Sequence, residues 1–284
     1  MAVFNKSSYK NKHFGFGEGL TLLGLIIGAI VILYPLFWMV VSSMKTYDEI
    51  YNNVWGFPSN WQIQNYVEAW SKGISSYFIN SVIVTGTTII AVIVFGSMAA
   101  FSLARYRTRM IDLALVFIIA GMMINPQVAI VPLFGILSSL DIINTRWALI
   151  LPYIAFRLPI TILLIRSYFL SIPKELEESA IIDGCSEFGI YWKIYLPIAK
   201  PILITAVVLT AFFAWNEFLF ATIFIDSNSL KTIPSGLMNF RDALRTDWGV
   251  LLAGMVISSL PMIVLLVALQ KHLVRGLSEG SVKG

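Results

Sequence analysis

The chain has 284 residues, of which 57% are hydrophobic and only 13% are charged, and its mean hydropathy is +0.79. Soluble domains carry roughly 25% charged residues, so this composition excludes an ordinary soluble domain and indicates a polytopic membrane protein. The net charge of +4 is spread between apolar blocks, which argues against a nucleic-acid-binding protein, and the single cysteine, Cys185, excludes an intrachain disulfide framework.

Six segments are long and apolar enough to span a membrane, which takes about 20 residues of helix. The first follows a segment with three lysines but is too long for a cleaved signal peptide, so we expect it to be retained. Prolines such as Pro126 and Pro159 should interrupt backbone hydrogen bonding, which is tolerated where helices line a cavity or bend. The predicted spans are residues 20–43, 81–104, 111–137, 147–169, 201–225 and 249–270.

The basic residues between these segments predict their orientation, because Lys and Arg accumulate in loops on the cytoplasmic side. Alternating connections hold thirteen basic residues on one side and six on the other, with Arg157 left inside a span. We therefore expect the terminal segments 1–19 and 271–284 in the cytoplasm, and the loops 44–80 and 226–248 on the outer side. The predicted fold class is an all-α polytopic protein of the cell (inner) membrane with six transmembrane helices.

A polar segment, residues 171–197, separates the fourth and fifth apolar blocks. Pro173 suits the first position of a helix, where its missing N–H costs nothing, and acidic residues follow in the first turns, where the helix dipole favours them. Gly184 should end this helix in the left-handed conformation. Ser186 should cap a second helix that runs to Pro197. The sequence thus predicts an amphipathic cytoplasmic hairpin.

An amphipathic hairpin must bury its apolar face in lipid headgroups or in a protein partner. The charges of this segment are mainly acidic, which suits anionic lipid poorly. We therefore favour a groove on a soluble partner over a membrane-surface helix that only joins two spans.

The same stretch resembles the cytoplasmic signature of the inner-membrane permeases of binding-protein-dependent ABC importers. That signature reads Glu-Ala-Ala, three residues, Gly, nine residues, Ile, one residue and Leu-Pro, and the spacing matches throughout, with Ser179 in place of an alanine. The matching residues are Glu178, Ser179, Ala180, Gly184, Ile194, Leu196 and Pro197, and Asp183 lies among them.

The resemblance covers almost the whole chain. The segment 80–107 resembles the start of the permease core, for which we take residues 81–270. The stretches "AWNEFLFA" at 214–221 and "LVRGLSEGSVKG" at 273–284 resemble the carbohydrate branch of the family, and within it the second permease subunit of the maltose type.

The resemblance implies a type I ABC importer permease fold and a non-catalytic subunit that transports a sugar or oligosaccharide. It implies a homologous permease subunit, two cytoplasmic ATPase subunits, an extracytoplasmic solute-binding protein and the lipid bilayer as partners. ATP and Mg would be used by the ATPase subunits, and no cofactor would be bound directly. The hairpin would dock in a cleft of an ATPase subunit and relay its closure to the spans, and the tail 271–284 would reach between the ATPase subunits.

Charged and amide side chains inside spans are costly and usually face a cavity or each other, and we single out Arg157, Asn216 and Glu217. Asn216 and Glu217 are about 22–24 Å from the cytoplasmic end of the fifth span, at 1.5 Å per residue. They could bind sugar hydroxyls along the translocation path, or hold the bundle together by an interhelical hydrogen bond. Arg157 could form a buried ion pair with Glu217 or meet an acidic substrate in a cavity. It could also snorkel, or mark a misplaced span boundary.

The outer loop 226–248 holds apolar residues that a solvated linker would not need. The stretch 237–244 spaces several of them for a short amphipathic helix, and we expect a flexible tip at residues 235–236. In maltose-type permeases the corresponding loop probes the sugar cleft of the docked binding protein. The alternative is a lid that packs only on neighbouring loops. The residues expected to contact the binding protein are Pro234, Ser235, Gly236, Leu237 and Met238.

Other functional classes find little support. The chain has no GK dipeptide, and hence no phosphate-binding loop, and no HExxH motif, and we predict no catalytic site. His13 and His272 have no third ligand within sequence reach, so we predict no metal site. Two alternatives stay open: a permease of the same family for a non-sugar solute or an acidic carbohydrate, and a stand-alone secondary transporter. The latter should show paired halves, and 20–137 does not repeat in 147–270.

Overall fold

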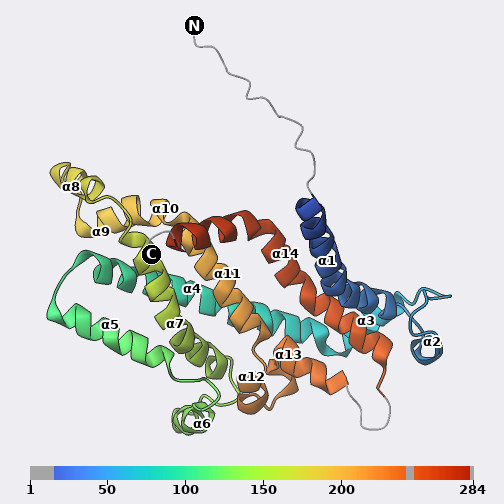
Figure 1. The fold of residues 1–284 in the computed structure, drawn as a ribbon. Coiled ribbons are helices and arrows are strands. Elements are labelled where there is room, and N and C mark those ends of the chain that lie inside the picture. Colours follow the sequence, from blue (N-terminus) through green and yellow to red (C-terminus); the bar gives the residue numbers. More distant parts are fainter. Residues whose placement is uncertain (1–15, 241–245, 282–284) are drawn as a thin grey trace.

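The computed structural model describes residues 16–240 and 246–281, with the backbone alone for residues 16, 18 and 272–281. Within these ranges the chain is helical and contains no strand (Figure 1). The α-helices are α1 (Phe16–Ser42), α2 (Tyr47–Asn52), α3 (Gln64–Ala69), α4 (Ser75–Arg105), α5 (Arg109–Met122), α6 (Ile130–Ser139), α7 (Trp147–Phe169), α8 (Lys174–Ile182), α9 (Glu187–Ile190), α10 (Leu196–Ile198), α11 (Lys200–Asn216), α12 (Leu219–Phe224), α13 (Ile233–Gly236) and α14 (Trp248–Ser281). Two π-helical turns, η1 (Trp70–Ile74) and η2 (Tyr191–Tyr195), and two 3-10 turns, η3 (Asn228–Leu230) and η4 (Leu237–Phe240), complete the described elements.

The long helices α4, α7, α11 and α14 form the centre of the fold. α4 packs along α7, and α11 lies against both α4 and α14. Gly96 of α4 permits close approach, since a Cβ there would lie 3.2 Å from Thr161 Cγ2 of α7. The apolar residues between these helices form three buried clusters, which contain Phe101, Tyr153 and Ile233 respectively.

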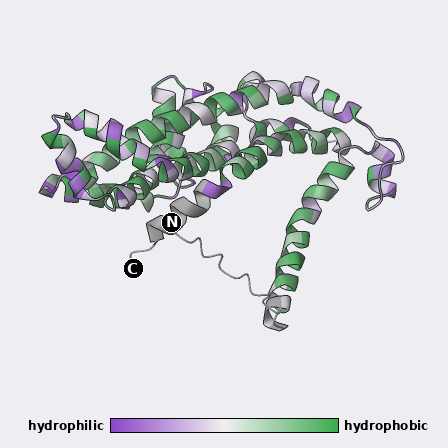
Figure 2. Cartoon of the chain, turned by 90° about the horizontal axis from the view of Figure 1, so that it is seen from above, coloured by the Kyte–Doolittle hydropathy of each residue, from purple (hydrophilic) through white to green (hydrophobic). Residues whose placement is uncertain are grey.

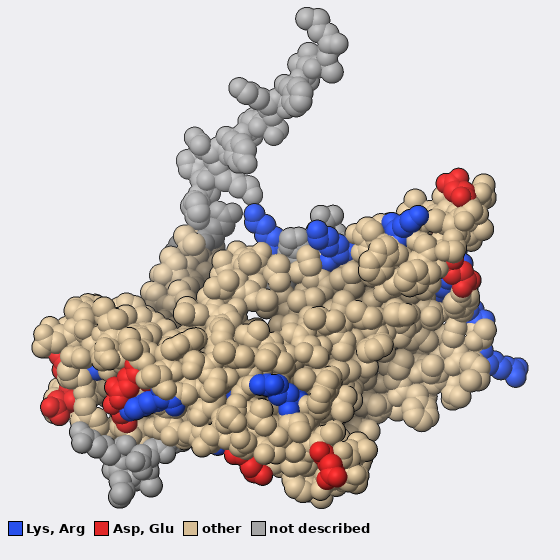
Figure 3. Space-filling model, turned by 180° about the vertical axis from the view of Figure 1, so that it is seen from behind, with Lys and Arg blue, Asp and Glu red and all other residues tan. Residues whose placement is uncertain are grey.

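Helix α1 stands apart from this bundle and contacts α14 (Figure 1). Its most apolar window is not buried by protein at any residue. A helix that is apolar all round and is not buried by protein needs an apolar solvent. Figure 2 shows the same apolar character along the long helices, and Figure 3 shows a broad uncharged region between charged groups near the edges. The described surface therefore suits a lipid bilayer.

Four described helices are long and apolar enough to cross a membrane, and a fifth is added if a bent pair, Glu187–Ile198 and Lys200–Asn216, counts as one. The four are Gly19–Ser42, Gln64–Arg105, Trp147–Phe169 and Trp248–Lys271. They match the first, second, fourth and sixth predicted spans. The helix Trp147–Phe169 has the bounds that were predicted for the fourth span. The helical stretch Gln64–Arg105 begins well before residue 81, inside the predicted loop 44–80. The structure does not confirm a count of six.

The predicted third span, residues 111–137, is divided, as its prolines led us to expect. Helix α5 ends at Met122, α6 begins at Ile130, and Pro126 lies between them. Proline lacks the amide donor and disfavours helical backbone in the residue before it. The break thus lies near one of the prolines that predicted an interruption, whereas Pro159 lies within the uninterrupted helix α7.

The predicted fifth span, residues 201–225, is also divided, although no interruption was predicted there. Helix α11 ends at Asn216 and α12 begins at Leu219. Glu217, between them, has extended backbone angles of φ −69° and ψ 124°. Its carboxylate accepts hydrogen bonds from the backbone N–H groups of Phe220 and Ala221 at 2.9 and 3.1 Å. An acidic side chain, rather than a proline, therefore stabilises this break.

The terminal segments are described only in part. The backbone of the predicted tail 271–284 continues α14 as a helix to Ser281. Residues 282–284, and residues 1–15 of the predicted segment 1–19, lie outside the described residues.

Candidate functional site

The first helix of the hairpin, α8, ends in a Schellman motif. Pro173, which was predicted as the first helical residue, is the N-cap, and the helix begins one residue later at Lys174. Gly184 has a φ of +77°, and its N–H donates to the carbonyl of Ile181 at 3.0 Å, while the N–H of Cys185 donates to that of Ala180 at 2.9 Å. These are the two hydrogen bonds that define the motif. The prediction that Gly184 ends this helix is confirmed.

The second helical stretch begins at the predicted cap. The Ser186 hydroxyl accepts a hydrogen bond from the N–H of Gly189 at 3.2 Å. The helix continues through α9, η2 and α10 to Ile198, then turns by 77° into α11, which has Pro201 in its first turn. The hairpin therefore lies across the direction of α11, at one end of the bundle (Figure 1).

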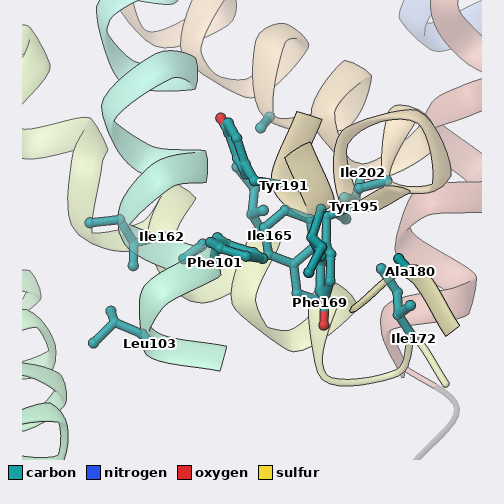
Figure 4. Packing of buried hydrophobic residues seen from close by; sticks show 14 residues of the cluster. Phe101, Leu103, Ile162, Ile165, Phe169, Ile172, Ala180, Tyr191, Tyr195 and Ile202 are labelled. Carbon is teal, nitrogen blue, oxygen red and sulfur yellow. The ribbon is translucent and has the colours of Figure 1, made fainter. Parts of the chain in front are cut away.

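Aromatic side chains fix the hairpin to the bundle. Phe101 of α4 packs against Tyr191 and Tyr195 of η2, with ring centroids 5.4 and 4.9 Å away (Figure 4). Phe169 of α7 meets Tyr195 edge to face at 5.1 Å. The hydroxyls of Tyr191 and the buried Ser97 are 2.8 Å apart. Because every one of these rings is buried, the hairpin belongs to the same core as α4 and α7.

An ion pair joins the end of α4 to α8. Arg105 Nε lies 2.8 Å from Glu177 Oε1, and the side chains are only 13% and 16% exposed. The Tyr195 hydroxyl donates to Glu177 Oε2 at 2.8 Å. Sequence reasoning gave none of these three residues a role. The available signals were a basic residue at the end of a predicted span and an acid next to the signature, and neither identifies its partner.

A second acid extends this network to α9. Arg105 Nη2 is 3.9 Å from Glu187 Oε1. The Tyr106 phenol also hydrogen-bonds Glu187, and this contact, with a smaller effect of burial, raises the pKa of the phenol. Both helical parts of the hairpin are thus tied to the end of α4.

The structure divides the eight signature residues into two groups. Glu178, Ser179, Asp183, Gly184 and Pro197 are exposed, whereas Ala180 is buried and Ile194 and Leu196 are half-buried against the cluster that contains Phe101.

Large apolar side chains on the same hairpin are also exposed. Ile182 is 86% exposed, Phe188 64% and Trp192 60%. Together with Glu178 and Asp183 they form what we call the hairpin surface. Exposed apolar side chains beside acids are typical of an interaction site.

The left-handed backbone of Gly184 gives a direct test of the hairpin turn. A Cβ at this position would meet no atom within 4 Å, so a side chain is limited by conformation and not by space. Gly184→Val should cost roughly 1–2 kcal/mol because a β-branched residue resists positive φ. Gly184→Asn tolerates that conformation and serves as the control. Thermal unfolding of the purified protein should separate the two variants. Equal stability would contradict the assigned turn.

A cavity of about 520 Å³ lies where the two broken helical stretches meet α7. The structure brings the three predicted intramembrane residues together in its wall, with Arg157 from α7 and Asn216 and Glu217 from the break after α11. Gln127, from the break after α5, also faces it. Several phenylalanines complete a wall that is mostly apolar: Phe212, Phe213, Phe218 and Phe220.

The predicted ion pair between Arg157 and Glu217 does not form in the described structure. Glu217 Oε2 accepts hydrogen bonds from the Tyr153 hydroxyl at 2.6 Å and from the N–H of Ala221, and Oε1 accepts from Phe220. The Arg157 guanidinium lies 5.3 Å from the centre of the Phe213 ring. Glu217 therefore has the interhelical role that was one of its two predicted alternatives, while also lining the cavity.

The prediction of a flexible tip at residues 235–236 is wrong. Ser235 is only 3% exposed, and Ser235 and Gly236 belong to α13, which packs on the start of α4. The N–H of Ile233 donates to the Ser81 hydroxyl at 2.9 Å. Of the five predicted contact residues, only Met238 is exposed. The predicted helix 237–244 is a 3-10 turn over Leu237–Phe240, and its remainder lies outside the described residues.

Replacement of Gly236 tests this packing. A Cβ at Gly236 would lie 2.3 Å from Tyr77 Cδ2 and 2.5 Å from Cγ, and this ring is buried. Gly236→Ala should destabilise the protein by about 1–3 kcal/mol, as overpacking does. Gly86→Ala in α4 is the control, because its Cβ meets nothing within 4 Å and alanine favours a helix. The melting temperature in detergent should fall only for Gly236→Ala.

A bundle of membrane-length apolar helices, interrupted around a cavity with a few polar residues in its wall and carrying an exposed hairpin, defines a membrane transport protein. The chain belongs to the family of binding-protein-dependent transport system inner membrane components, which its residues 92–279 match. The hairpin, the cavity and the C-terminal part of α4 lie in the matched region.

Two relatives and one solved structure extend this result. The chain is 53% identical to the probable ABC transporter permease protein YurM of Bacillus subtilis (strain 168), over 94% of this chain and 89% of the relative. It is 32% identical to the trehalose/maltose transport system permease protein MalG of Thermococcus litoralis, over 93% of this chain and 96% of the relative. One chain of a bacterial ABC transporter involved in the import of the acidic polysaccharide alginate has the same fold, with a TM-score of 0.79 and 22% sequence identity. The match covers 92% of the present chain and 99% of the transporter chain. The resemblance to carbohydrate permeases is thus confirmed.

Proposed function

We propose that this chain is the transmembrane permease subunit of an ATP-driven importer for a sugar or oligosaccharide. The observation that carries the proposal is the hairpin, with a rigid core on α4 and α7 and an exposed surface of acids and large apolar groups. The full-length similarity to sugar-transport permeases supports the solute class.

The proposed topology has six spans, with both termini in the cytoplasm of a cell whose inner membrane holds the protein. The third span is formed by α5 and α6 together and the fifth by α11 and α12. Support comes from the loop charges, thirteen against six. Broken spans of this kind are tolerated where the irregular backbone lines a cavity.

The proposed partners are a homologous permease, two ATPase subunits that use ATP and Mg, and an extracytoplasmic solute-binding protein. The hairpin surface, including Glu178 and Trp192, would enter a cleft of one ATPase subunit. The binding protein would meet the outer loop 226–248, where Met238 is 46% exposed next to the packed residues Pro234–Leu237. The tail 271–284 would reach between the ATPase subunits. The name of the family supports the dependence on a binding protein.

Assembly and transport test the proposal together. The chain is co-expressed with the partner permease and ATPase encoded nearest to it, purified, and reconstituted in liposomes with the binding protein. We expect the ATPase to co-purify, and labelled sugar to enter only when ATP and the binding protein are present. Uptake by the chain alone, driven by a proton or sodium gradient, would instead support a stand-alone secondary transporter.

A further inference from the structure

Arg157 is a cation with no counter-ion in the described part of the chain. Its Nε is buried and has no hydrogen-bond partner there, and the side chain forms no ion pair with a described residue. Its guanidinium lies over the ring of Phe213. A cation–π contact contributes about 0.5–2 kcal/mol, which offsets only part of the cost of removing an arginine from water.

The nearest candidate partner is already occupied. Both carboxylate oxygens of Glu217 accept hydrogen bonds, from Tyr153 and from two N–H groups at the start of α12. These contacts hold the carboxylate in the break between α11 and α12. Arg157 therefore faces the cavity with donors that the protein does not use.

The other walls of the cavity suit a saccharide. Phe212 and Phe218 offer apolar surface for the C–H faces of a sugar ring. Asn216 donates to the carbonyl of Phe212 and keeps its side-chain oxygen free as an acceptor for hydroxyls. The volume of about 520 Å³ lies within the usual range for small-molecule sites, roughly 300–1,000 Å³.

We propose that the cavity is a solute subsite for a saccharide that carries a carboxylate, which Arg157 binds bidentately. Guanidinium and carboxylate match in geometry, and their paired hydrogen bonds are stronger in a site of low dielectric. This inference rests on the proposed function and narrows its solute class to acidic sugars.

A lipid headgroup is the other source of an anion, and the position of Arg157 argues against it. Arg157 lies ten residues after Trp147 and twelve before Phe169 in the continuous helix α7. At 1.5 Å per residue it is about 15–18 Å from either end, near the depth of the hydrocarbon midplane. Phosphates of the bilayer lie at the interfaces, so a solute that enters the cavity is the expected anion.

Binding to the purified permease assembly, in nanodiscs of neutral phosphatidylcholine, tests this directly. The probes are glucuronate and glucose, which differ only in the carboxylate, and affinity is measured by calorimetry or tryptophan fluorescence. Wild type should bind glucuronate at least ten-fold more tightly than glucose. Arg157→Gln should lower the glucuronate affinity at least ten-fold and change that for glucose less than three-fold.

Two further variants complete the test. Arg157→Lys keeps the charge but not the paired donors, so its affinity for glucuronate should be intermediate. Arg109→Gln removes an exposed arginine outside the cavity and should bind both probes like wild type. Arg157→Gln should be at least as heat-stable as wild type, because Arg157 has no counter-ion to lose. Equal affinity for both probes, unchanged glucuronate binding in Arg157→Gln, or unfolding of both Arg157 variants would overturn the inference. An importer that transports neutral sugars without this discrimination would keep the proposed function and lose the acidic subsite.

Discussion

Replacing Glu178 by lysine is expected to reduce uptake to less than a tenth of wild type and to abolish co-purification of the ATPase. Glu178 is exposed, and the described part of the chain offers its side chain no hydrogen bond or ion pair. Its carboxylate lies on the hairpin surface beside Ile182. The substitution therefore reverses a charge that serves a partner while leaving the fold of the chain intact.

A matched substitution separates partner contact from general charge effects. Asp112 is an exposed acid in the first turn of α5, outside the hairpin. Asp112→Lys makes the same charge change and should retain ATPase binding and uptake. Thermal unfolding of the isolated chain should be unchanged for Glu178→Lys. Normal uptake in that variant would remove the hairpin surface from the proposed mechanism.

The second large effect is expected at the anchor of the hairpin. Glu177→Arg places two cations together at a site where both native side chains are less than a fifth exposed. Breaking a largely buried ion pair costs about 3–5 kcal/mol, so the hairpin should separate from α4 and transport should be lost. The double variant Arg105→Glu with Glu177→Arg restores opposite charges and should recover part of the uptake.

The native sequence supplies a reporter for this separation. Cys185 is the single cysteine of the chain, is half-buried, and packs against the cluster that contains Phe101. Glu177→Arg should increase the rate at which a water-soluble maleimide labels Cys185, and the double variant should lower it again. Slow labelling in all three proteins would show that the hairpin stays docked without the ion pair.

Local chemistry explains which features could be predicted from sequence. Gly184 and Ser186 act on backbone groups a few residues away, so the helix end and the cap were visible in a short stretch. The break after α5 was signalled by Pro126 for the same reason. The contact between Arg105 and Glu177 joins residues far apart in the chain, and no local pattern indicates it.

The two principal errors have the same origin. Gly236 was expected in a flexible tip, but the ring of Tyr77, far away in sequence, occupies the space beside it. Within the predicted span 201–225 no interruption was predicted. The break is stabilised by the capping contacts of Glu217 and by Tyr153 from another helix. Tertiary contacts therefore decided both positions.

Helix α4 is held at both ends by segments distant in sequence. Near its start the Asn80 amide donates to the carbonyls of Ser229 and Lys231, and at its end Arg105 binds Glu177. The helix runs for 31 residues, about 46 Å, without interruption. Its central amides should exchange hydrogen with solvent only when the whole bundle opens, whereas the segment between α5 and α6, in which no residue is buried, can open locally. The protein thus combines a slowly exchanging central helix with one segment that can change conformation at little cost in free energy.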